Sequence, residues 1–380
     1  MISERSLFLH LLRILSAFIV VLGHTKEFLF VHMNENANLP EKIIRLFLSL
    51  GSAAVLVFFF LSGYLVGGKV IRKSLDGDLS FRLYIFDRLT RLWIVLLPAL
   101  FVTFAINALT CMNSRISLYC SADTRLASHA SVPPVFSQDI SDFFANLFFL
   151  QPFHGMPWGG NGPLWSLSYE FWYYLVFFSL VVILDNFLKR DLNYGLIFHF
   201  FIIFLASRIL EFEWVILGFI WIGGALASYL LEISPVKFVS SINYKFRKLK
   251  FTTVTIVLII PVLIILKSAP RLIALPMSVL LLMFSVFIMK GDDPSNINRK
   301  LQALIIRGSE FSFSLYLIHF PVLALAATYL TPINRWEMSG LGLLIMLGID
   351  FVVLIAAYAF AWMTEFNLVR FRLRLLSVRK

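Results

Sequence analysis

Long apolar segments dominate this 380-residue chain, and they restrict it to very few folds. A helix needs about 20 mostly apolar residues to cross the hydrocarbon core of a bilayer. We predict about ten such helices, at residues 7–23, 43–66, 92–109, 164–184, 192–209, 213–231, 252–267, 272–289, 310–330 and 340–363. Residues 142–153 are apolar but too short to span, so we predict a re-entrant or interfacial segment there. Because lipid offers no partners for backbone groups, the fold class is an all-α, polytopic membrane protein.

Composition supports this class and argues against nucleic acid as a partner. Hydrophobic residues make up 59% of the chain and charged residues only 14%, against about 25% charged residues in soluble domains. The net charge is +11, and 23 of the 33 Lys and Arg fall in segments that share the side of the N-terminus. Positive loops of membrane proteins face the cytoplasm. We therefore expect both termini to be cytoplasmic, with a transmembrane domain at 1–364, a basic tail at 365–380, and lipids as the surroundings.

The first apolar segment carries two residues that lipid does not tolerate well, Arg13 and His24. They are eleven positions apart, which puts them on nearly the same helix face and roughly 16 Å apart along the axis. A buried Arg costs roughly 3 kcal/mol in a membrane helix, so it needs a partner or a polar cavity. We predict that the first helix turns this face toward a polar cavity inside the protein.

Other polar residues interrupt the apolar segments at a few places. Ser62 stands in the block FFFLSGY, Glu170 in the block WSLSYEFWYY, and His319 in the block SLYLIHFP. The segment 110–165 is long for a connection and is rich in Gly, Pro and Trp near its end. Ordered loops of that length are usually functional. We predict that this loop covers the outer end of the polar cavity.

These blocks resemble the acyltransferase-3 family of integral membrane O-acyltransferases. Arg13 and His24 match the R-x10-H signature of the first helix in that family, and the three blocks above match further family blocks in the same order. Arg88 and Arg91, followed by Pro98, match the basic start of its third helix. The resemblance extends over essentially the whole chain.

The resemblance implies an enzyme of the bacterial inner membrane that uses acetyl-CoA. Members transfer an acyl group, usually acetyl, from cytoplasmic acyl-coenzyme A to a hydroxyl of a surface glycan such as the O-antigen of lipopolysaccharide. Some members carry a fused SGNH-type esterase domain that completes the transfer. None is visible in these 380 residues, so we expect direct transfer to the glycan or hand-over to a separate protein.

Acyl transfer assigns a role to each candidate residue. His24 is the expected general base or transient acyl carrier, because the pKa of His suits proton transfer near neutral pH. Glu170 would orient the imidazole of His24, and Arg13 would bind an acidic group or the thioester oxyanion. Arg88 and Arg91 would receive the phosphates of coenzyme A. Candidates for substrate binding are Asn161, Trp165, Tyr174, Ser62 and His319.

Several alternatives stay open at this stage. A buried Arg and His also fit a transporter or a glycan flippase. An acyltransferase of the MBOAT type would make His319 the catalytic residue. Ser62 is explained equally well by close helix packing. Cys111 and Cys120 form either a disulfide or two free thiols, and no ligand pattern for a metal accompanies them.

Overall fold

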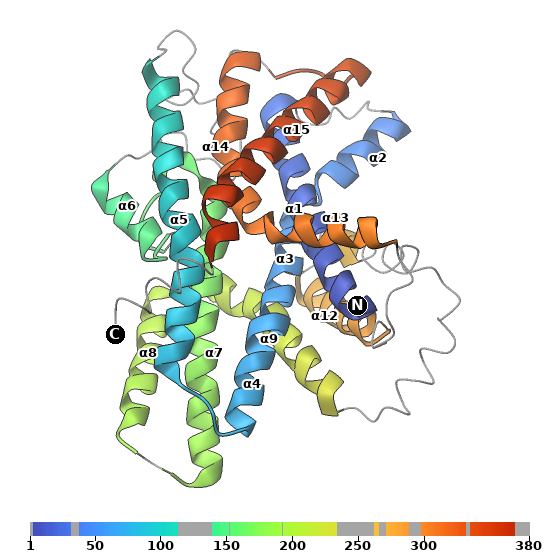
Figure 1. Ribbon diagram of the computed structural model, residues 1–380. Coiled ribbons are helices and arrows are strands. Elements are labelled where there is room, and N and C mark those ends of the chain that lie inside the picture. The colour runs from blue at the N-terminus through green and yellow to red at the C-terminus, as the bar shows by residue number, and fades with distance from the viewer. Residues whose placement is uncertain are drawn as a thin grey trace. The chain divides into compact units, whose positions relative to one another are not determined.

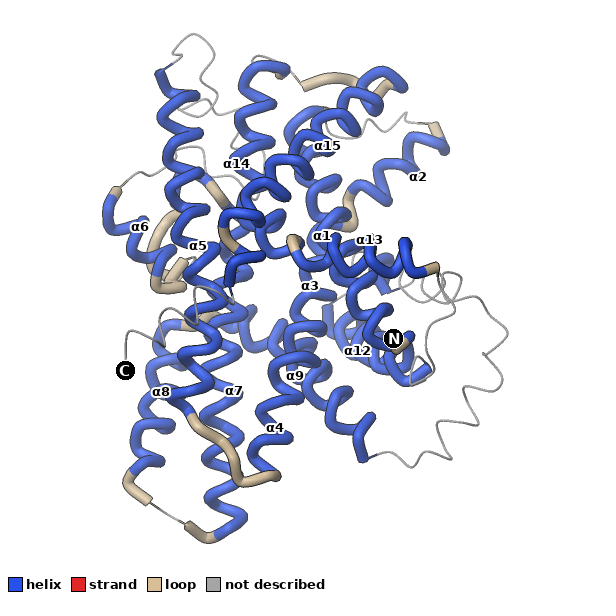
Figure 2. The backbone as a smooth tube through the Cα atoms, viewed as in Figure 1, coloured by secondary structure: helices blue, strands red, loops and turns tan. Residues whose placement is uncertain are grey.

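The computed structural model describes most of the chain. The described residues are 3–31, 38–112, 139–151, 153–191, 193–233, 262–265, 271–288, 298–331 and 335–368. Nearly all of them are helical, and none of the described residues belongs to a strand (Figure 2). Cys120, most of the helix expected at 252–267, and residues 369–380 of the basic tail lie outside the described residues.

Seven described helices are long and apolar enough to cross a membrane. They are Arg5–Leu29, Leu39–Leu75, Phe81–Thr110, Gly162–Lys189, Phe212–Leu231, Ser312–Leu330 and Gly340–Asn367. Gly195–Ile209 and Ala274–Val286 are shorter apolar helices at two further predicted positions. The all-α, polytopic membrane fold is therefore confirmed.

The helices are continuous in some places and broken in others (Figure 1). In chain order they are α1 (Glu4–Leu29), α2 (Leu39–Leu48), α3 (Gly51–Ser62), α4 (Gly68–Leu75), α5 (Phe81–Met112), α6 (Ile140–Leu147), α7 (Trp165–Lys189), α8 (Gly195–Ile209), α9 (Phe212–Ile233), α12 (Arg271–Ile288), α13 (Arg299–Glu310), α14 (Ser312–Leu330) and α15 (Gly340–Met363). The single helix expected at 43–66 is in fact α2 and α3, separated by a turn at Ser49 and Leu50. A short π-helical segment, η1 (Gly63–Gly67), joins α3 to α4.

The chain divides into two compact units, which are described separately. The first unit comprises Met1–Ser16, Ser52–Ile85 and Tyr169–Ser309, and the second comprises Ala17–Gly51, Phe86–Ser168 and Glu310–Lys380. Helix α1 contributes its first half to one unit and its second half to the other.

Glycines hold the first unit together where η1 and α4 cross α9. A Cβ atom on Gly63 would lie 1.8 Å from the carbonyl oxygen of Trp221, and one on Gly224 would lie 2.0 Å from that of Phe60. Any side chain at either position would therefore force the helices apart. Small residues allow such close crossings in membranes, where packing replaces the hydrophobic effect between helices. This crossing fixes the place of Ser62, which directly precedes η1.

The second unit is built around α14, which packs beside α15 (Figure 1). Helix α14 contains Pro321, which has no N–H for the carbonyl of Leu317 one turn earlier. The side chain of Asn161 supplies the missing donor, with Nδ2 at 2.9 Å from the Leu317 carbonyl oxygen. The Gly/Pro-rich loop is thereby attached to the middle of α14.

The segment expected at 142–153 contains a helix that is too short to span a bilayer. It is α6, of eight residues, followed by a turn at Phe148 and Phe149. The loop beyond it continues through η2 (Trp158–Gly160) and η3 (Gly162–Leu164) into α7. Trp158 donates from Nε1 to the carbonyl of Leu100 at 3.1 Å, which attaches this loop to α5 as well.

Candidate active site

Two histidines from distant parts of the chain meet in the second unit. His24 on α1 places Nδ1 2.9 Å from Nε2 of His319 on α14. The two rings stack, with centroids 5.1 Å apart and an angle of 21° between their planes. His319 is fully buried, whereas His24 is partly exposed. We call these two residues the histidine pair.

The surroundings of His319 define which nitrogens carry protons. Nδ1 of His319 lies 2.8 Å from the carbonyl oxygen of Tyr316 and 3.1 Å from that of Leu315. Carbonyl oxygens only accept, so this Nδ1 is the donor, and Nε2 of a neutral His319 is an acceptor. His24 must then donate its Nδ1–H to His319. The lone pair of a neutral His24 is therefore on Nε2, the nitrogen suited to take a proton or an acyl group.

A buried carboxyl group contacts Thr25, the residue that follows His24. Thr25 follows His24, and its hydroxyl lies 2.9 Å from the carbonyl oxygen of Val21 and next to Oδ1 of Asp350 on α15. Asp350 is only 1% exposed, and its Oδ2 has no hydrogen-bond partner among the described residues. Thr25 has one proton for two acceptors. The arrangement is satisfied when Asp350 is neutral and donates to Thr25, which then donates to Val21.

The Gly/Pro-rich loop is fixed to α14 next to His319. The hydroxyl of Tyr316 donates to the carbonyl of Pro163 at 2.9 Å, and Ser166 lies 2.7 Å from the same hydroxyl. Asn161 is buried, and its amide group is committed to Leu317 on α14. Trp165 is partly buried at the first position of α7. Asn161 thus has a structural role in addition to its predicted contact with substrate.

The first unit holds a second polar group, which we call the carboxylate cluster. Oε1 of Glu170 on α7 accepts hydrogen bonds from the hydroxyl groups of Ser62 at 2.7 Å and of Tyr174. Trp221 on α9 donates from Nε1 to Ser62 at 3.2 Å. The donors of this cluster therefore converge on one carboxyl oxygen, either directly or through Ser62.

The predicted cationic residues lie on α1 and α5. Arg13 belongs to the first unit and is partly buried on α1. Arg88 and Arg91 are partly buried on α5 in the second unit, where Arg88 forms an ion pair with the neighbouring Asp87. Among the described residues, no group of three His, Cys, Asp or Glu side chains is arranged to hold a metal ion.

The structure thus joins some predicted residues and places others apart. His24 meets His319, and Glu170 meets Ser62 and Tyr174. His24 and Glu170 belong to different units, so their pairing stays a prediction. Sequence reasoning missed Asp350 and Trp221. Asp350 has a detectable signal, because it is the only charged residue in α15, and ionisable residues inside membrane helices are commonly functional.

Fold and site together define a multi-pass membrane protein that holds a pair of contacting histidines. The comparison with protein families makes this class specific, because a family model described as "Acyltransferase domain" matches residues 6–364. The chain therefore belongs to the acyltransferase-3 family of membrane acyltransferases. No curated protein and no solved structure matches it significantly.

Proposed function

We propose that this membrane acyltransferase moves an acetyl group from acetyl-coenzyme A to a hydroxyl of a surface polysaccharide in the bacterial inner membrane. The observation that carries the proposal is the histidine pair, in which His319 accepts the Nδ1–H of His24. In hydrolase triads, a partner that accepts the Nδ1–H of the catalytic histidine keeps Nε2 basic and correctly oriented. The acceptor that fills this position is a second histidine held by two backbone carbonyls.

The proposed chemistry needs one base and one leaving group. Nε2 of His24 takes the proton of the glycan hydroxyl while the hydroxyl oxygen attacks the thioester carbonyl. The carbon–oxygen bond forms, the carbon–sulfur bond breaks, and the thiolate of coenzyme A leaves and takes up the proton. Arg13 is proposed to stabilise the oxyanion that develops on the carbonyl oxygen. In a second route, Nε2 attacks the thioester carbonyl, the carbon–sulfur bond breaks and the thiolate of coenzyme A leaves. The glycan hydroxyl then takes the acetyl group from Nε2, the carbon–nitrogen bond breaks, and the hydroxyl proton passes to the thiolate.

Glu170 is proposed to support this chemistry. Its Oε1 accepts hydrogen bonds from Ser62 and Tyr174, which orient the side chain. A carboxylate at the site would stabilise His24 in the protonated form that follows proton transfer. Ser62 and Tyr174 therefore act here as positioning residues for Glu170, in addition to any contact with substrate.

The test is acetyl transfer by the purified protein in nanodiscs. Acetyl-coenzyme A and surface polysaccharide serve as substrates, and acetylated glycan is measured by mass spectrometry. We expect His24→Ala to reduce the rate by at least about 100-fold, as removal of a general base does. Glu170→Gln and Arg13→Gln should also reduce it. Full activity of His24→Ala would refute the mechanism.

A matched control separates catalysis from folding. His199 on α8 is another buried histidine, which contacts the hydroxyl of Ser179 at 3.1 Å. His199→Asn keeps a hydrogen-bonding group at that position, so this variant should retain wild-type activity. Detection of glycan flux without any use of acetyl-coenzyme A would instead favour a transporter or flippase.

A further inference from the structure

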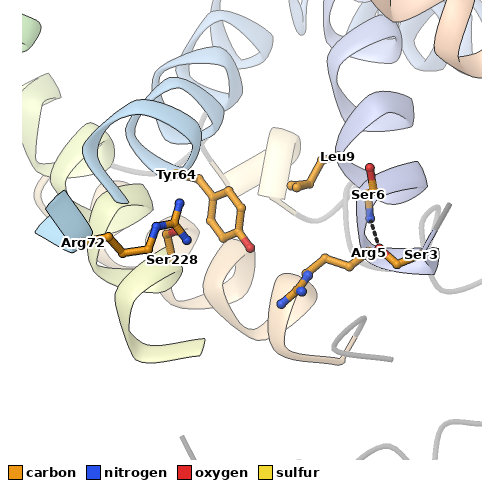
Figure 3. A pocket seen from close by; sticks show the side chains of 7 residues that line it. All are labelled: Ser3, Arg5, Ser6, Leu9, Tyr64, Arg72 and Ser228. Atoms are coloured by element: carbon orange, nitrogen blue, oxygen red, sulfur yellow. Dashed lines mark hydrogen bonds between the residues drawn. The ribbon is translucent and has the colours of Figure 1, made fainter. Parts of the chain in front are cut away.

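A basic pocket lies in the first unit, and none of its lining residues has been assigned a role above. It has a volume of about 240 Å³ and is lined by Ser3, Arg5, Ser6, Leu9, Tyr64, Arg72 and Ser228. These residues come from the start of α1, from η1, from the last turn of α4 and from α9 (Figure 3). We call it the arginine pocket.

The lining of the arginine pocket suits an anion with several oxygen atoms. Figure 3 shows the guanidinium groups of Arg5 and Arg72 on either side of Tyr64, whose hydroxyl points into the space between them. Three serines add further hydroxyl groups, and no Asp or Glu is among the described residues that line the pocket. Arginine is the preferred partner of phosphate groups, because its planar fork donates two parallel hydrogen bonds.

The size of the pocket restricts which part of a ligand it can hold. Pockets for whole drug-sized ligands measure about 300–1,000 Å³. At about 240 Å³ the arginine pocket would take a diphosphate but not a complete nucleotide cofactor. A larger ligand would therefore place its diphosphate here and extend beyond the pocket in both directions.

One face of α1 leads from this pocket into the membrane domain. Arg5, Leu9 and Arg13 are spaced by four residues, so they line the same face of the helix. Arg13 lies roughly 12 Å further along the axis than Arg5. Leu9 provides an apolar surface between the two charges. The same helix face thus offers a cation, then an apolar stretch, then a second cation.

We propose that the arginine pocket binds the diphosphate of acyl-coenzyme A, so that the pantetheine arm runs along α1 past Leu9 toward Arg13. This proposal rests on the proposed function, because it names the site at which that donor docks. The predicted topology places the start of α1 and the end of α4 on the cytoplasmic side, where the donor is found. It differs from the predicted assignment of the phosphates to Arg88 and Arg91, and binding measurements on variants of both sites decide between them.

The test compares ligands that differ only in their phosphates. Binding of coenzyme A, 4′-phosphopantetheine and pantetheine is measured calorimetrically on the purified full-length protein in phosphatidylcholine nanodiscs. Free coenzyme A is used so that no turnover occurs. We expect Arg5→Gln and Arg72→Gln each to weaken coenzyme A binding by about 10- to 100-fold, the range of a charged hydrogen bond. Pantetheine should bind the wild type and both variants equally.

Control variants test whether position and charge are responsible. Arg82 is exposed on the first turn of α5 and does not line the pocket, so Arg82→Gln should bind coenzyme A like the wild type. Arg72→Lys keeps the charge and should recover part of the affinity lost in Arg72→Gln. Wild-type binding by the double variant Arg5→Gln/Arg72→Gln, together with loss of binding in Arg88→Gln/Arg91→Gln, would overturn the proposal and leave the proposed function intact.

Two further outcomes distinguish coenzyme A binding in the arginine pocket from failure of the proposed function and from binding of a lipid phosphate. If the wild type itself binds no coenzyme A, the proposed function fails, and the pocket assignment fails with it. A lipid phosphate is the other source of the same chemistry, so binding is repeated with phosphatidylglycerol in the nanodiscs. If the double variant loses bound phosphatidylglycerol but keeps its affinity for coenzyme A, the occupant is lipid and the proposal is refuted.

Discussion

The hydrogen bond to His319 on α14 decides the tautomer of His24. The role of His319 as an acceptor can therefore be tested by replacing it with a side chain of similar shape. Gln places a carbonyl oxygen close to the position of Nε2 in His, so His319→Gln preserves an acceptor for the Nδ1–H of His24. His319→Ala removes the acceptor and leaves the Nδ1–H of His24 without this hydrogen bond. We expect the Ala variant to lose about 100-fold or more in acetylation rate and the Gln variant to lose much less, measured in the nanodisc assay.

The same pair of variants discriminates between the two acyltransferase mechanisms. If His319 were itself the catalytic base, as in the MBOAT reading, Gln would be as inactive as Ala and His24→Ala would keep its activity. Equal loss in both His319 variants, with an intact protein in gel filtration, would therefore contradict the role of His319 as an acceptor.

The hydrogen bond between Asp350 and Thr25 allows a prediction about which of the two side chains donates the proton. If Asp350 is neutral and donates to Thr25, then Asn can replace it, because the amide Nδ2 also donates. We expect Asp350→Asn to keep both the wild-type melting temperature and the acetylation rate. Asp350→Ala loses the hydrogen bond and leaves a cavity, so it should destabilise the protein by about 1–3 kcal/mol.

The opposite result for Asp350→Asn would assign Asp350 another role. A variant that melts like the wild type but does not acetylate glycan would show that the ionised carboxylate is needed. In that case Asp350, next to the residue that follows His24, would be a proton acceptor in the reaction. Thermal unfolding and the nanodisc assay on the same preparation distinguish the two results.

Single residues show where sequence reasoning reaches its limit. Arg13, His24, Glu170 and His319 stand out because lipid penalises polar groups, and this penalty can be read from the chain. The contact between His24 and His319 joins positions 295 residues apart, and it depends on how α1 and α14 pack. Arg5 and Arg72 could not be singled out at all, because topology alone accounts for basic residues near helix ends.

At the scale of elements, the crossing of η1 with α9 is the most sensitive contact of the first unit. A Cβ on Gly224 would lie 2.0 Å from the Phe60 carbonyl oxygen and 2.8 Å from the Tyr64 nitrogen, both backbone atoms that cannot move aside singly. We therefore expect Gly224→Ala to separate the helices and to lower the yield of folded protein, measured by gel filtration in detergent. The substitution should also weaken the hydrogen bond from Nε1 of Trp221 to the hydroxyl of Ser62.

A second glycine in a membrane helix serves as the control for that prediction. Nothing lies within 4 Å of a Cβ built on Gly348 in α15, so Gly348→Ala should fold at least as well as the wild type. If Gly224→Ala and Gly348→Ala behaved alike, the close crossing would not be a determinant of folding.

Elements were predictable where apolar length alone decides them. Helices α1, α9, α14 and α15 fall at the expected positions, because a bilayer demands that length. Helix α5 begins at Phe81, eleven residues before the expected start, because its first turns are amphipathic and basic rather than apolar. The break between α2 and α3 was also missed, since no Pro or run of Gly marks it, and Ser49 ends α2 by local hydrogen bonds to Leu46.

At the scale of the whole molecule, orientation in the membrane decides whether donor and acceptor arrive from opposite sides. The excess of Lys and Arg on one side predicts that both termini are cytoplasmic. It also predicts that the end of α5, with Cys111, and the segment after it, with Cys120, are outside. The family assignment is compatible with either orientation. A direct measurement is therefore needed, and the chain contains its own probes, because its only two cysteines are Cys111 at the end of α5 and Cys120 beyond it.

The measurement uses a thiol reagent that does not cross membranes. In spheroplasts, a charged maleimide should label the wild-type protein from outside. If Cys111 and Cys120 form a disulfide, labelling should require prior reduction, which settles that question in the same experiment. A variant with Cys111→Ala, Cys120→Ala and a cysteine added after Lys380 should be labelled only after the membrane is permeabilised. Labelling of this variant in intact spheroplasts would place the C-terminus outside. With the ten predicted spans, the start of α1 lies on the same side as the C-terminus, so the arginine pocket would then face away from the cytoplasmic donor.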